Sequence, residues 1–534
     1  MEKMPSSIFN DVIGPVMRGP SISHVAAAAR IGRLIRMSAE NQVQQVIVDF
    51  DPNGSLAESY HGHGSDIGLV SGLLGMELTD PRVGISLDVA KQENVDVQFN
   101  IIDYGAVHPN NYRMKVTSGT GKTHLWEAIS VGGGMIEMQK LDGFDINVCG
   151  DFYELLVFST GEGADAVKAA AGKLPRVEYI LDSVKDNGTL VNIKTVQPVS
   201  GEILEEIKSI PGVSCVIILD PILPTKSSAN CKVPFRTAAQ LLEFAKTSDR
   251  QMWQMATLYE SMRGGTTEEE AYQKMYDLAS IMLNCVEEGL AGTEYKDRIL
   301  GPQAFLMDKA RLKNPLMPAD LLCNVIRNIT AVMEVKSSFG VIIAAPTAGS
   351  CGCLPGTVTG VGETLKLDQD TMTKGLLAAD LIGVFVSEQA TFAAEVAGCQ
   401  AECGVGSSMT AAAIVQMLGG TVEQCCDAAS LAMQNITGLV CDPVANRVEV
   451  PCLGKNVMGG SNAIASASMI LAGYDKVIPL DETILAMYDI GQKLPIELRC
   501  TLGGLGKLPL PLRSANVLPD GVLSRSQDRR GIMK

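Results

Sequence analysis

A proline-rich segment at residues 221–236 divides the chain into two parts with different sequence patterns. The segment, PILPTKSSANCKVPFR, carries three prolines among polar residues, which is typical of a linker. Before it, strand-like stretches alternate with helical ones, whereas from Thr237 onward apolar residues recur at helical spacing. A chain of 534 residues is also too long for one ordinary core. We therefore expect a multidomain fold that ends in a mostly α-helical domain.

The first 150 residues predict an α+β domain. Strand patterns occupy residues 43–51, 83–89 and 95–104. Residues 24–41, HVAAAARIGRLIRMSAEN, form an alanine-rich amphipathic pattern that predicts a helix. Mixed strands and helices of this kind pack as two layers around one core.

Residues 151–220 predict the element order βαββαβ, which is the ferredoxin-like pattern. This order resembles an ACT domain, a small module that often binds an amino acid at a domain interface. The segment shows no cluster of catalytic residue types. We expect a regulatory or dimerising role, with a structural spacer as the alternative.

Charge and apolar patterning exclude several classes of protein. The net charge of −16 argues against a nucleic-acid partner, whose phosphates require a positive surface. The N-terminal residues lack the apolar core of a signal peptide, and no run of 18 apolar residues predicts a membrane span. These features predict a cytoplasmic protein, in which the 14 cysteines stay reduced.

Three cysteines differ from the rest in their surroundings. Cys399, Cys441 and Cys452 lie among glycine, proline, aspartate and asparagine rather than on apolar helical faces. Paired zinc knuckles are absent from the pattern, although Cys403 would share a helix face with Cys399 if that segment is helical. We expect glycine-rich loops between the helices at 349–356, 398–406, 418–420 and 454–460.

The histidines are confined to the first predicted domain. They are His24, His61, His63, His108 and His124, and four of them lie in polar or glycine-rich segments that predict loops. Histidine titrates closest to neutral pH, so the first domain is the expected source of a general base or a carboxylate-binding group. A structural role remains the alternative for any one of them.

Several motifs together resemble one known family. The segments IIAAPTAGSCGCLPGTV (342–358), AGCQAE (397–402), GLVCDPVANRVEVPC (438–452) and KNVMGGSNAIASASMILAG (455–473) resemble the α part of bacterial iron–sulfur L-serine dehydratases. Earlier segments, SIFNDVIGPVMRGPSISH, ESYHGHGSD and AVHPNN, resemble the β part. The resemblance implies a β-type domain at 1–150, an ACT-like domain at 151–220, a linker at 221–236 and an α-type helical domain at 237–534.

The resemblance also implies a cofactor and a reaction. Cys399, Cys441 and Cys452 match the family's ligands to a [4Fe-4S] cluster, and no pyridoxal phosphate is needed. Three protein ligands leave one iron open to act as a Lewis acid on the substrate's β-hydroxyl. The implied reaction is the elimination of water from L-serine, a lyase reaction that yields pyruvate and ammonia. The amino acid is the small-molecule partner, and a homodimer is expected.

Roles for further residues follow from the same resemblance. His63 is the expected base or proton shuttle, and His24 with Ser21 and Ser23 is expected to position the base or bind the substrate carboxylate. The remaining expected substrate-binding residues are His108, Thr347, Ser350 and Asn456. For Thr347 and Ser350, the alternative is a loop that merely turns the chain.

Departures from the family pattern leave the substrate open. Ile22 and Val25 replace two hydroxyl residues, and residues 299–305 replace a glycine-rich segment. Cys500 stands where the family has a glutamate-containing pattern, so it is a candidate fourth cluster ligand or a packing residue. Cys351 and Cys353 replace small or apolar residues. The same chemistry on threonine, cysteine or another β-substituted acid is one alternative, and a non-catalytic amino-acid sensor is the other.

Overall fold

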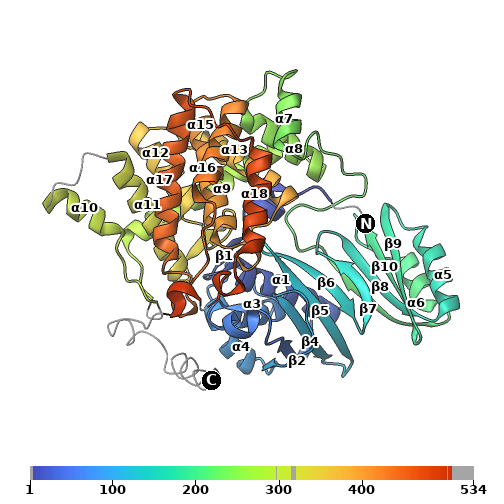
Figure 1. Ribbon diagram of the computed structural model, residues 1–534. Helices are drawn as coiled ribbons and strands as arrows, with labels where there is room; N and C mark the ends of the chain where they lie inside the picture. Colours follow the sequence, from blue (N-terminus) through green and yellow to red (C-terminus); the bar gives the residue numbers. More distant parts are fainter. Residues whose placement is uncertain (1–3, 296–297, 314–319, 502, 508–534) are drawn as a thin grey trace. The chain divides into compact units, whose positions relative to one another are not determined.

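The computed structural model describes residues 4–295, 298–313, 320–501 and 503–507 (Figure 1). It divides the chain into two compact units. Unit 1 contains the described residues up to Pro15, together with Ile22–Arg236 and Leu258–Ala271. Unit 2 contains Val16–Ser21, Thr237–Thr257 and the described residues from Tyr272 onward. The N-terminal α/β part and the helical C-terminal part confirm the predicted multidomain class, while the division into three domains and a linker stays a prediction.

A six-stranded mixed sheet forms the first half of unit 1. Only β2 and β3 are parallel, and the other neighbours are antiparallel. Along β2, Val46, Val48 and Phe50 are fully buried and alternate with more exposed residues, so one face of the strand enters the core. In spatial order the strands are β3 (Asp96–Ile101), β2 (Val43–Phe50), β4 (Asn111–Ser118), β5 (Thr123–Gly132), β6 (Met135–Leu141) and β7 (Phe144–Val148).

Two helices of unit 1, α1 (Ala27–Ser38) and α3 (Ser65–Leu73), pack closely at glycines. A β-carbon at Gly32 of α1 would lie 2.9 Å from the backbone nitrogen of Leu73. Ile31, Leu34 and Ile35 of α1 join the core of the six-stranded sheet. The predicted helix at 24–41 is therefore confirmed, and a short helix, α2 (Leu56–Ser59), precedes α3.

The strand predicted at residues 83–89 was wrong. This segment forms the 3₁₀ turn η3 (Val83–Ile85) and the start of α4 (Ser86–Gln92). Its buried residues are Val83, Ser86, Val89 and Ala90, a helical spacing rather than a strand alternation, and Ile85 is exposed. Parallel strands such as β2 and β3 require a crossover connection, which is usually helical.

The second half of unit 1 has the predicted element order βαββαβ. Its helices are α5 (Gly161–Ala171) and α6 (Glu202–Ser209). Val157 and Val191 face the helices, while Leu156 and Leu190 on the opposite sheet face join the core of the six-stranded sheet. The antiparallel strands, in spatial order, are β11 (Val213–Leu219), β8 (Tyr153–Ser159), β10 (Gly188–Thr195) and β9 (Val177–Lys185).

A buried ion pair crosses this second sheet. Lys194 Nζ lies 2.7 Å from Glu154 Oε1, and both side chains are 1% exposed. Asn192 Nδ2 donates to Glu154 Oε2 at 2.7 Å. Burial raises the pKa of Glu154, partly offset by Lys194. Burial is the largest effect on Lys194 and by itself would lower its pKa, but attraction to Glu154 and Asp151, together with the hydrogen bond to Glu154, raises that pKa.

Unit 2 is built around the fully buried helix α15 (Figure 1). Helices α12, α13, α16 and α17 pack against it. A short antiparallel pair, β1 (Val16–Arg18) with β12 (Val341–Ile343), also belongs to this unit. The helices of the C-terminal part are α7 (Ala238–Ala245), α8 (Met252–Gly264), α9 (Glu268–Ala291), α10 (Ala304–Lys313), α11 (Asp320–Ser337), α12 (Cys353–Leu365), α13 (Gln369–Gln389), α14 (Ala394–Ala397), α15 (Cys403–Met417), α16 (Val422–Ile436), α17 (Cys452–Leu471) and α18 (Leu480–Lys493).

The glycine-rich loop predicted at residues 454–460 was wrong, because these residues lie inside α17. A β-carbon at Gly459 would lie 3.0 Å from Cys353 Sγ, and one at Gly460 would lie 2.7 Å from Ile329 Cδ1. The predicted loops at 349–356 and 398–406 likewise end in the first turns of α12 and α15. Gly459 and Gly460 therefore permit close helix packing rather than chain reversal. Among the described residues, no helix has both the length and the apolar composition needed to cross a membrane.

Candidate functional site

Four cysteines of unit 2, which we call the thiol cluster, pack together: Cys399, Cys403, Cys441 and Cys500. Cys399 begins the 3₁₀ turn η4 (Cys399–Ala401), and Cys403 begins α15. Gly398 has a φ of 75°, a left-handed conformation that allows the chain to turn from α14 into η4. The Sγ atoms of Cys399 and Cys403 are 3.6 Å apart. The four-residue spacing therefore brings two sulfur atoms together.

Cys441 and Cys500 are joined by a short stretch of backbone pairing. Cys441 N donates to Leu498 O, and Cys500 N donates to Cys441 O, both at 2.9 Å. Cys500 has a φ of 61°, which a residue with a β-carbon rarely adopts, so the surrounding pairing maintains this conformation. The two thiols are also hydrogen-bonded. This pairing brings the predicted fourth-ligand candidate beside Cys441.

Hydrogen bonding within the thiol cluster favours a thiolate at Cys399. Bonds from Cys403 and Cys441 lower the pKa of Cys399 well below its usual range, although burial opposes them. The same bonds, with burial, raise the pKa values of Cys403 and Cys441. Lys455 Nζ, 2.8 Å from Asp442 Oδ1, adds an attractive positive charge. The thiolate is the form of cysteine that binds metals.

Cys452 lies outside the tightest group of donor atoms. One donor atom each from Cys399, Cys441 and Glu402 lies within 4.8 Å of the others. Cys452 is buried at the first position of α17, and burial is the main cause that raises its pKa to about 12. Asn456, one turn later, has its Nδ2 2.8 Å from Cys452 O and 3.8 Å from Cys403 Sγ. The Asn456 amide therefore connects the backbone at Cys452 with the thiol cluster.

Asn456 also holds the loop that precedes α12. Its Oδ1 accepts hydrogen bonds from Gly352 N at 3.1 Å and Cys353 N at 2.9 Å, and its Nδ2 donates to Gly349 O at 2.8 Å. In the same loop, Thr347 Oγ1 and Ser350 Oγ lie 3.1 Å apart, and both residues are buried. The two hydroxyl groups thus bond within the loop.

Cys351 and Cys353, which depart from the family pattern, are fully buried. Burial raises the pKa of Cys351 to about 11 and that of Cys353 to about 12. Cys353 Sγ also lies 3.6 Å from Thr410 Oγ1. Both thiols are therefore in their protonated form at neutral pH.

Glu402 is a candidate ligand or proton-carrying residue that the sequence interpretation missed. Burial, repulsion from Cys399 and repulsion from Glu395 raise the pKa of Glu402 well above its usual range. A hydrogen bond with Thr347 acts in the opposite direction. The available signal was its place in GCQAE, three residues after Cys399, where a helical turn returns a side chain to the same face.

His24 lies in the π-helical turn η2 (Ile22–Ala26) of unit 1, so its predicted loop location was wrong. The neighbouring Ile22 and Val25 are buried core residues that extend the packing of α1. His24 Nε2 lies 2.8 Å from Ser59 Oγ, and its Nδ1 lies 3.1 Å from Ser23 Oγ. Burial lowers the pKa of His24 to about 3, so the ring is neutral.

His63 packs against His24. Their ring centroids are 4.6 Å apart in an edge-to-face arrangement, and His63 is 1% exposed. His61, two residues earlier, differs, because its side chain is 63% exposed and its Nδ1 lies 2.6 Å from Asp66 Oδ2. The structure thus brings His24, His63, Ser23 and Ser59 together in unit 1, whereas Ser21 falls in the range of unit 2.

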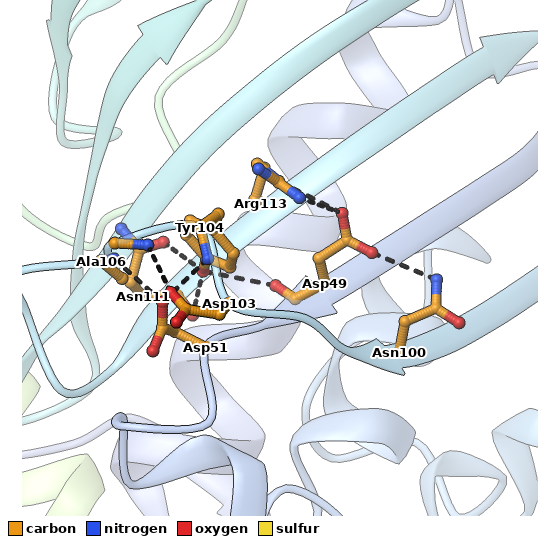
Figure 2. A network of polar contacts seen from close by, with 9 residues as sticks. Asp49, Asp51, Asn100, Asp103, Tyr104, Ala106, Asn111 and Arg113 are labelled. Atoms are coloured by element: carbon orange, nitrogen blue, oxygen red, sulfur yellow. Dashed lines mark hydrogen bonds and ion pairs between the residues drawn. The ribbon is translucent and has the colours of Figure 1, made fainter.

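His108 lies in a loop held by Asp51. Asp51 Oδ2 accepts hydrogen bonds from Tyr104 N at 3.1 Å and Ala106 N at 3.0 Å, as Figure 2 shows. Backbone hydrogen bonds lower the pKa of Asp51 to about 2, and the bond from Asn53 has the largest effect. His108 Nδ1 itself accepts a hydrogen bond from Asn110 N at 3.1 Å. The position of His108 therefore depends on a carboxylate distant in the sequence.

Comparison with known proteins identifies relatives for both parts of the chain. Residues 238–505 match the family model described as serine dehydratase alpha chain. The chain is 39% identical over 276 residues to the probable L-serine dehydratase, alpha chain, of Bacillus subtilis (strain 168). This match covers 52% of this chain and 92% of the relative. It is 35% identical over 212 residues to the probable beta chain of the same organism, covering 39% of this chain and 94% of the relative.

A single-chain relative spans both regions. The L-serine dehydratase of Streptomyces coelicolor is 26% identical over 493 residues, which is 91% of this chain and 95% of the relative. The α-type and β-type matches thus occur in one polypeptide, as the sequence motifs indicated. The chain belongs to the L-serine dehydratase family of lyases, with regions that correspond to the beta and alpha chains fused in one molecule.

Proposed function

We propose that this protein uses an iron–sulfur cluster to eliminate water from L-serine, which yields pyruvate and ammonia. The observation that carries the proposal is the convergence of buried thiols at Cys399 and Cys441 in a chain of this family. The proposed cluster ligands are Cys399, Cys441 and Cys452.

The donor set fits such a cluster. Thiolates are the usual protein ligands of iron–sulfur clusters, and all three proposed ligands are buried cysteines. Bonds from neighbouring thiols already favour the thiolate at Cys399. A multi-iron cluster spaces its ligands around its corners, so the position of Cys452 outside the tightest group is compatible with a third corner. When bound, a cluster with one iron not held by the protein supplies a Lewis acid for the substrate hydroxyl.

The chain's own residues would perform the proton transfer and hold the substrate. In this proposal His63 takes the α-proton, and His24, held by Ser23 and Ser59, positions the His63 ring. His24 is a positioning residue rather than the base, because burial lowers its pKa to about 3 and so makes its ring a weak proton acceptor.

The remaining proposed contacts with substrate are polar. Thr347 and Ser350 offer hydroxyls from a loop whose backbone N–H groups suit a carboxylate, and Asn456 fixes that loop. Ser21, Ser23 and His108 are the further proposed substrate-binding residues.

The test combines cofactor analysis with a substrate screen. Full-length protein purified without oxygen should contain iron and acid-labile sulfide, and should form pyruvate from L-serine. Cys399→Ser, Cys441→Ser and Cys452→Ser should each lose iron, whereas Cys425→Ser, a buried cysteine of α16, should retain it. Full activity in air with a chelator would refute the cluster. Faster turnover of L-threonine or L-cysteine than of L-serine would reassign the substrate.

We also propose that residues 151–220 form an ACT-like module that responds to an amino acid. The strand order β11-β8-β10-β9 and the packing of α5 and α6 against one sheet face support this. Calorimetric titration of the Cys441→Ser variant with L-serine tests it, because binding without a cluster would locate a second amino-acid site. Absence of any heat with the common amino acids would favour a structural spacer. A homodimer remains a prediction from the family resemblance, and a cytoplasmic location remains a prediction from the apolar patterning of the sequence.

A further inference from the structure

A cysteine, a histidine and an aspartate from three different elements meet in unit 1, and they share no residue with the thiol cluster. His124 lies on β5, Cys215 lies on β11, and Asp142 lies in the turn between β6 and β7. His124 Nδ1 is 2.7 Å from Asp142 Oδ2. The Cys215 thiol is hydrogen-bonded to the same imidazole. Neither Cys215 nor His124 has a role in the reaction proposed above.

Asp142 holds the imidazole in one orientation. Its second carboxylate oxygen, Oδ1, accepts a hydrogen bond from Leu125 N at 2.7 Å, and its own backbone nitrogen donates to Leu125 O at 2.8 Å. Asp142 has a φ of 51°, a conformation suited to the tight turn with Gly143. The carboxylate is thus fixed from both sides. Since Nδ1 faces Asp142, Nε2 is the nitrogen left for the sulfur of Cys215.

Strand pairing places Cys215 and His124 against the same aromatic ring. Cys215 pairs with Phe158 across β11 and β8. The Phe158 ring stacks on His124, with centroids 5.9 Å apart and an interplanar angle of 23°. The sulfur and the imidazole are therefore carried by strands, and the carboxylate by the tight turn that joins β6 and β7.

The electrostatic environment agrees with this geometry. Hydrogen bonds with Asp142, and then with Cys215, raise the pKa of His124 to about 9, although burial opposes them. A cysteine beside an imidazole that is oriented by a third group is the general arrangement of an activated thiol.

Cys231 offers an internal comparison in the same unit. Both Cys215 and Cys231 are half-buried. Cys231 Sγ donates to Arg263 O at 3.3 Å. Burial is the main cause that raises the pKa of Cys231. The two cysteines are similarly exposed, but only Cys215 lies beside His124. A comparison of their modification rates therefore separates the effect of the imidazole from the effect of accessibility.

We propose that Cys215, His124 and Asp142 form a thiol-modification site, at which Cys215 exchanges with small disulfides. In the exchange, the Cys215 sulfur attacks one sulfur of a disulfide RSSR, a new Cys215–S–S–R bond forms, and the RS–SR bond breaks. The departing thiolate RS⁻ takes up the proton that Cys215 and His124 share, so the products are the mixed disulfide and RSH. The small disulfide is the oxidant, and no other reactant is required.

The test measures modification rates in the full-length protein. Purified protein is exposed to oxidised glutathione for a series of short times, quenched with acid, alkylated and digested, and each cysteine is quantified by mass spectrometry. Cys215 should be modified at least roughly tenfold faster than Cys231. His124→Gln and Asp142→Asn should each reduce the Cys215 rate roughly tenfold, without changing the Cys231 rate, since the imidazole that shares the thiol proton, or the carboxylate that orients it, is lost.

Equal rates for Cys215 and Cys231 would overturn the proposal. An unchanged Cys215 rate in a folded His124→Gln variant would overturn it as well, because the imidazole contact would then be packing alone. The unchanged Cys231 rate and circular dichroism report whether each variant is folded. If His124→Gln does not fold, Asp142→Asn decides alone, because this substitution preserves the shape of the exposed turn.

Discussion

Two glycines of one helix should respond in opposite directions to the same substitution. Gly454 and Gly460 both lie in α17, the helix that begins at Cys452. A β-carbon at Gly454 meets no atom within 4 Å, whereas one at Gly460 would lie 2.7 Å from Ile329 Cδ1 and also against the hydroxyl of Thr357. Alanine is preferred over glycine in a helix interior by about 0.5–1 kcal/mol.

The expected magnitudes follow from these two surroundings. Gly454→Ala should stabilise α17 by about 0.5–1 kcal/mol, the propensity gain alone. Gly460→Ala receives the same gain but adds an overpacking cost of about 1–3 kcal/mol. Because the propensity gain cancels in the comparison, the difference between the two variants should equal the steric cost. Gly460→Ala should therefore be the less stable variant by about 1–3 kcal/mol.

Native-state hydrogen exchange of the α17 amides, read by mass spectrometry, measures the local opening free energy for each variant. The protection of α5 in unit 1 serves as an internal reference that neither substitution should change. Equal shifts of α17 protection in the two variants would refute the close packing of Gly460 against α11 and α12. A stabilised Gly460→Ala would do so even more directly.

Three further predictions concern buried polar groups. Asn456→Ala leaves several buried backbone groups without hydrogen-bond partners and should lower the hydrogen-exchange protection of the α12 amides by about 4 kcal/mol. Asn435→Ala, at an exposed asparagine, should lower it by under about 0.5 kcal/mol. Similar losses in the two variants would contradict the bridging role of Asn456. Lys194→Met should lower the free energy of unfolding of unit 1, measured in urea, by about 3–5 kcal/mol, because it leaves the Glu154 carboxylate buried without its partner. The loss should be smaller at low pH, where Glu154 is protonated, and a combined Glu154→Gln substitution should recover part of it. A loss that does not depend on pH would count against the buried ion pair. The pKa of His124 in the folded protein is raised to about 9, so the contribution of its protonated ring to the free energy of unfolding should be complete below about pH 6.5 and lost as the pH rises through 9. Urea unfolding of His124→Gln at several pH values measures this contribution. The same pH dependence in the variant and in the unsubstituted protein would disprove it.

Local patterns predicted those parts of the fold in which one short segment carries its own signal. The alternation in residues 43–51 identified β2, and the order of patterns between residues 151 and 220 identified the βαββαβ module. The same reasoning failed at residues 83–89, where Val, Ile and Leu suggested a strand. There the burial of Val83, Ser86 and Val89 shows that tertiary packing selected the helical period.

In the candidate site, too, some residues could be predicted from local sequence and others only from the tertiary structure. Cys399, Cys441 and Cys452 could be singled out because motifs around them resemble a family, and the spacing of Cys403 from Cys399 already allowed their sulfurs to meet. Glu402 was missed because its three-residue spacing from Cys399 matters only if the segment turns helically, and the structure supplies that turn and brings a carboxylate oxygen close to the Cys399 sulfur.

The sequence by itself determined the periodicities, the motifs and the family of this protein, because these are properties of neighbouring residues and of their order. Only the tertiary structure decided that Cys500 pairs with Cys441, that Gly460 serves helix packing, and that His124 lies between Asp142 and Cys215. These contacts join segments far apart in the chain. Their formation depends on backbone hydrogen bonds and close packing across elements, which no local pattern encodes.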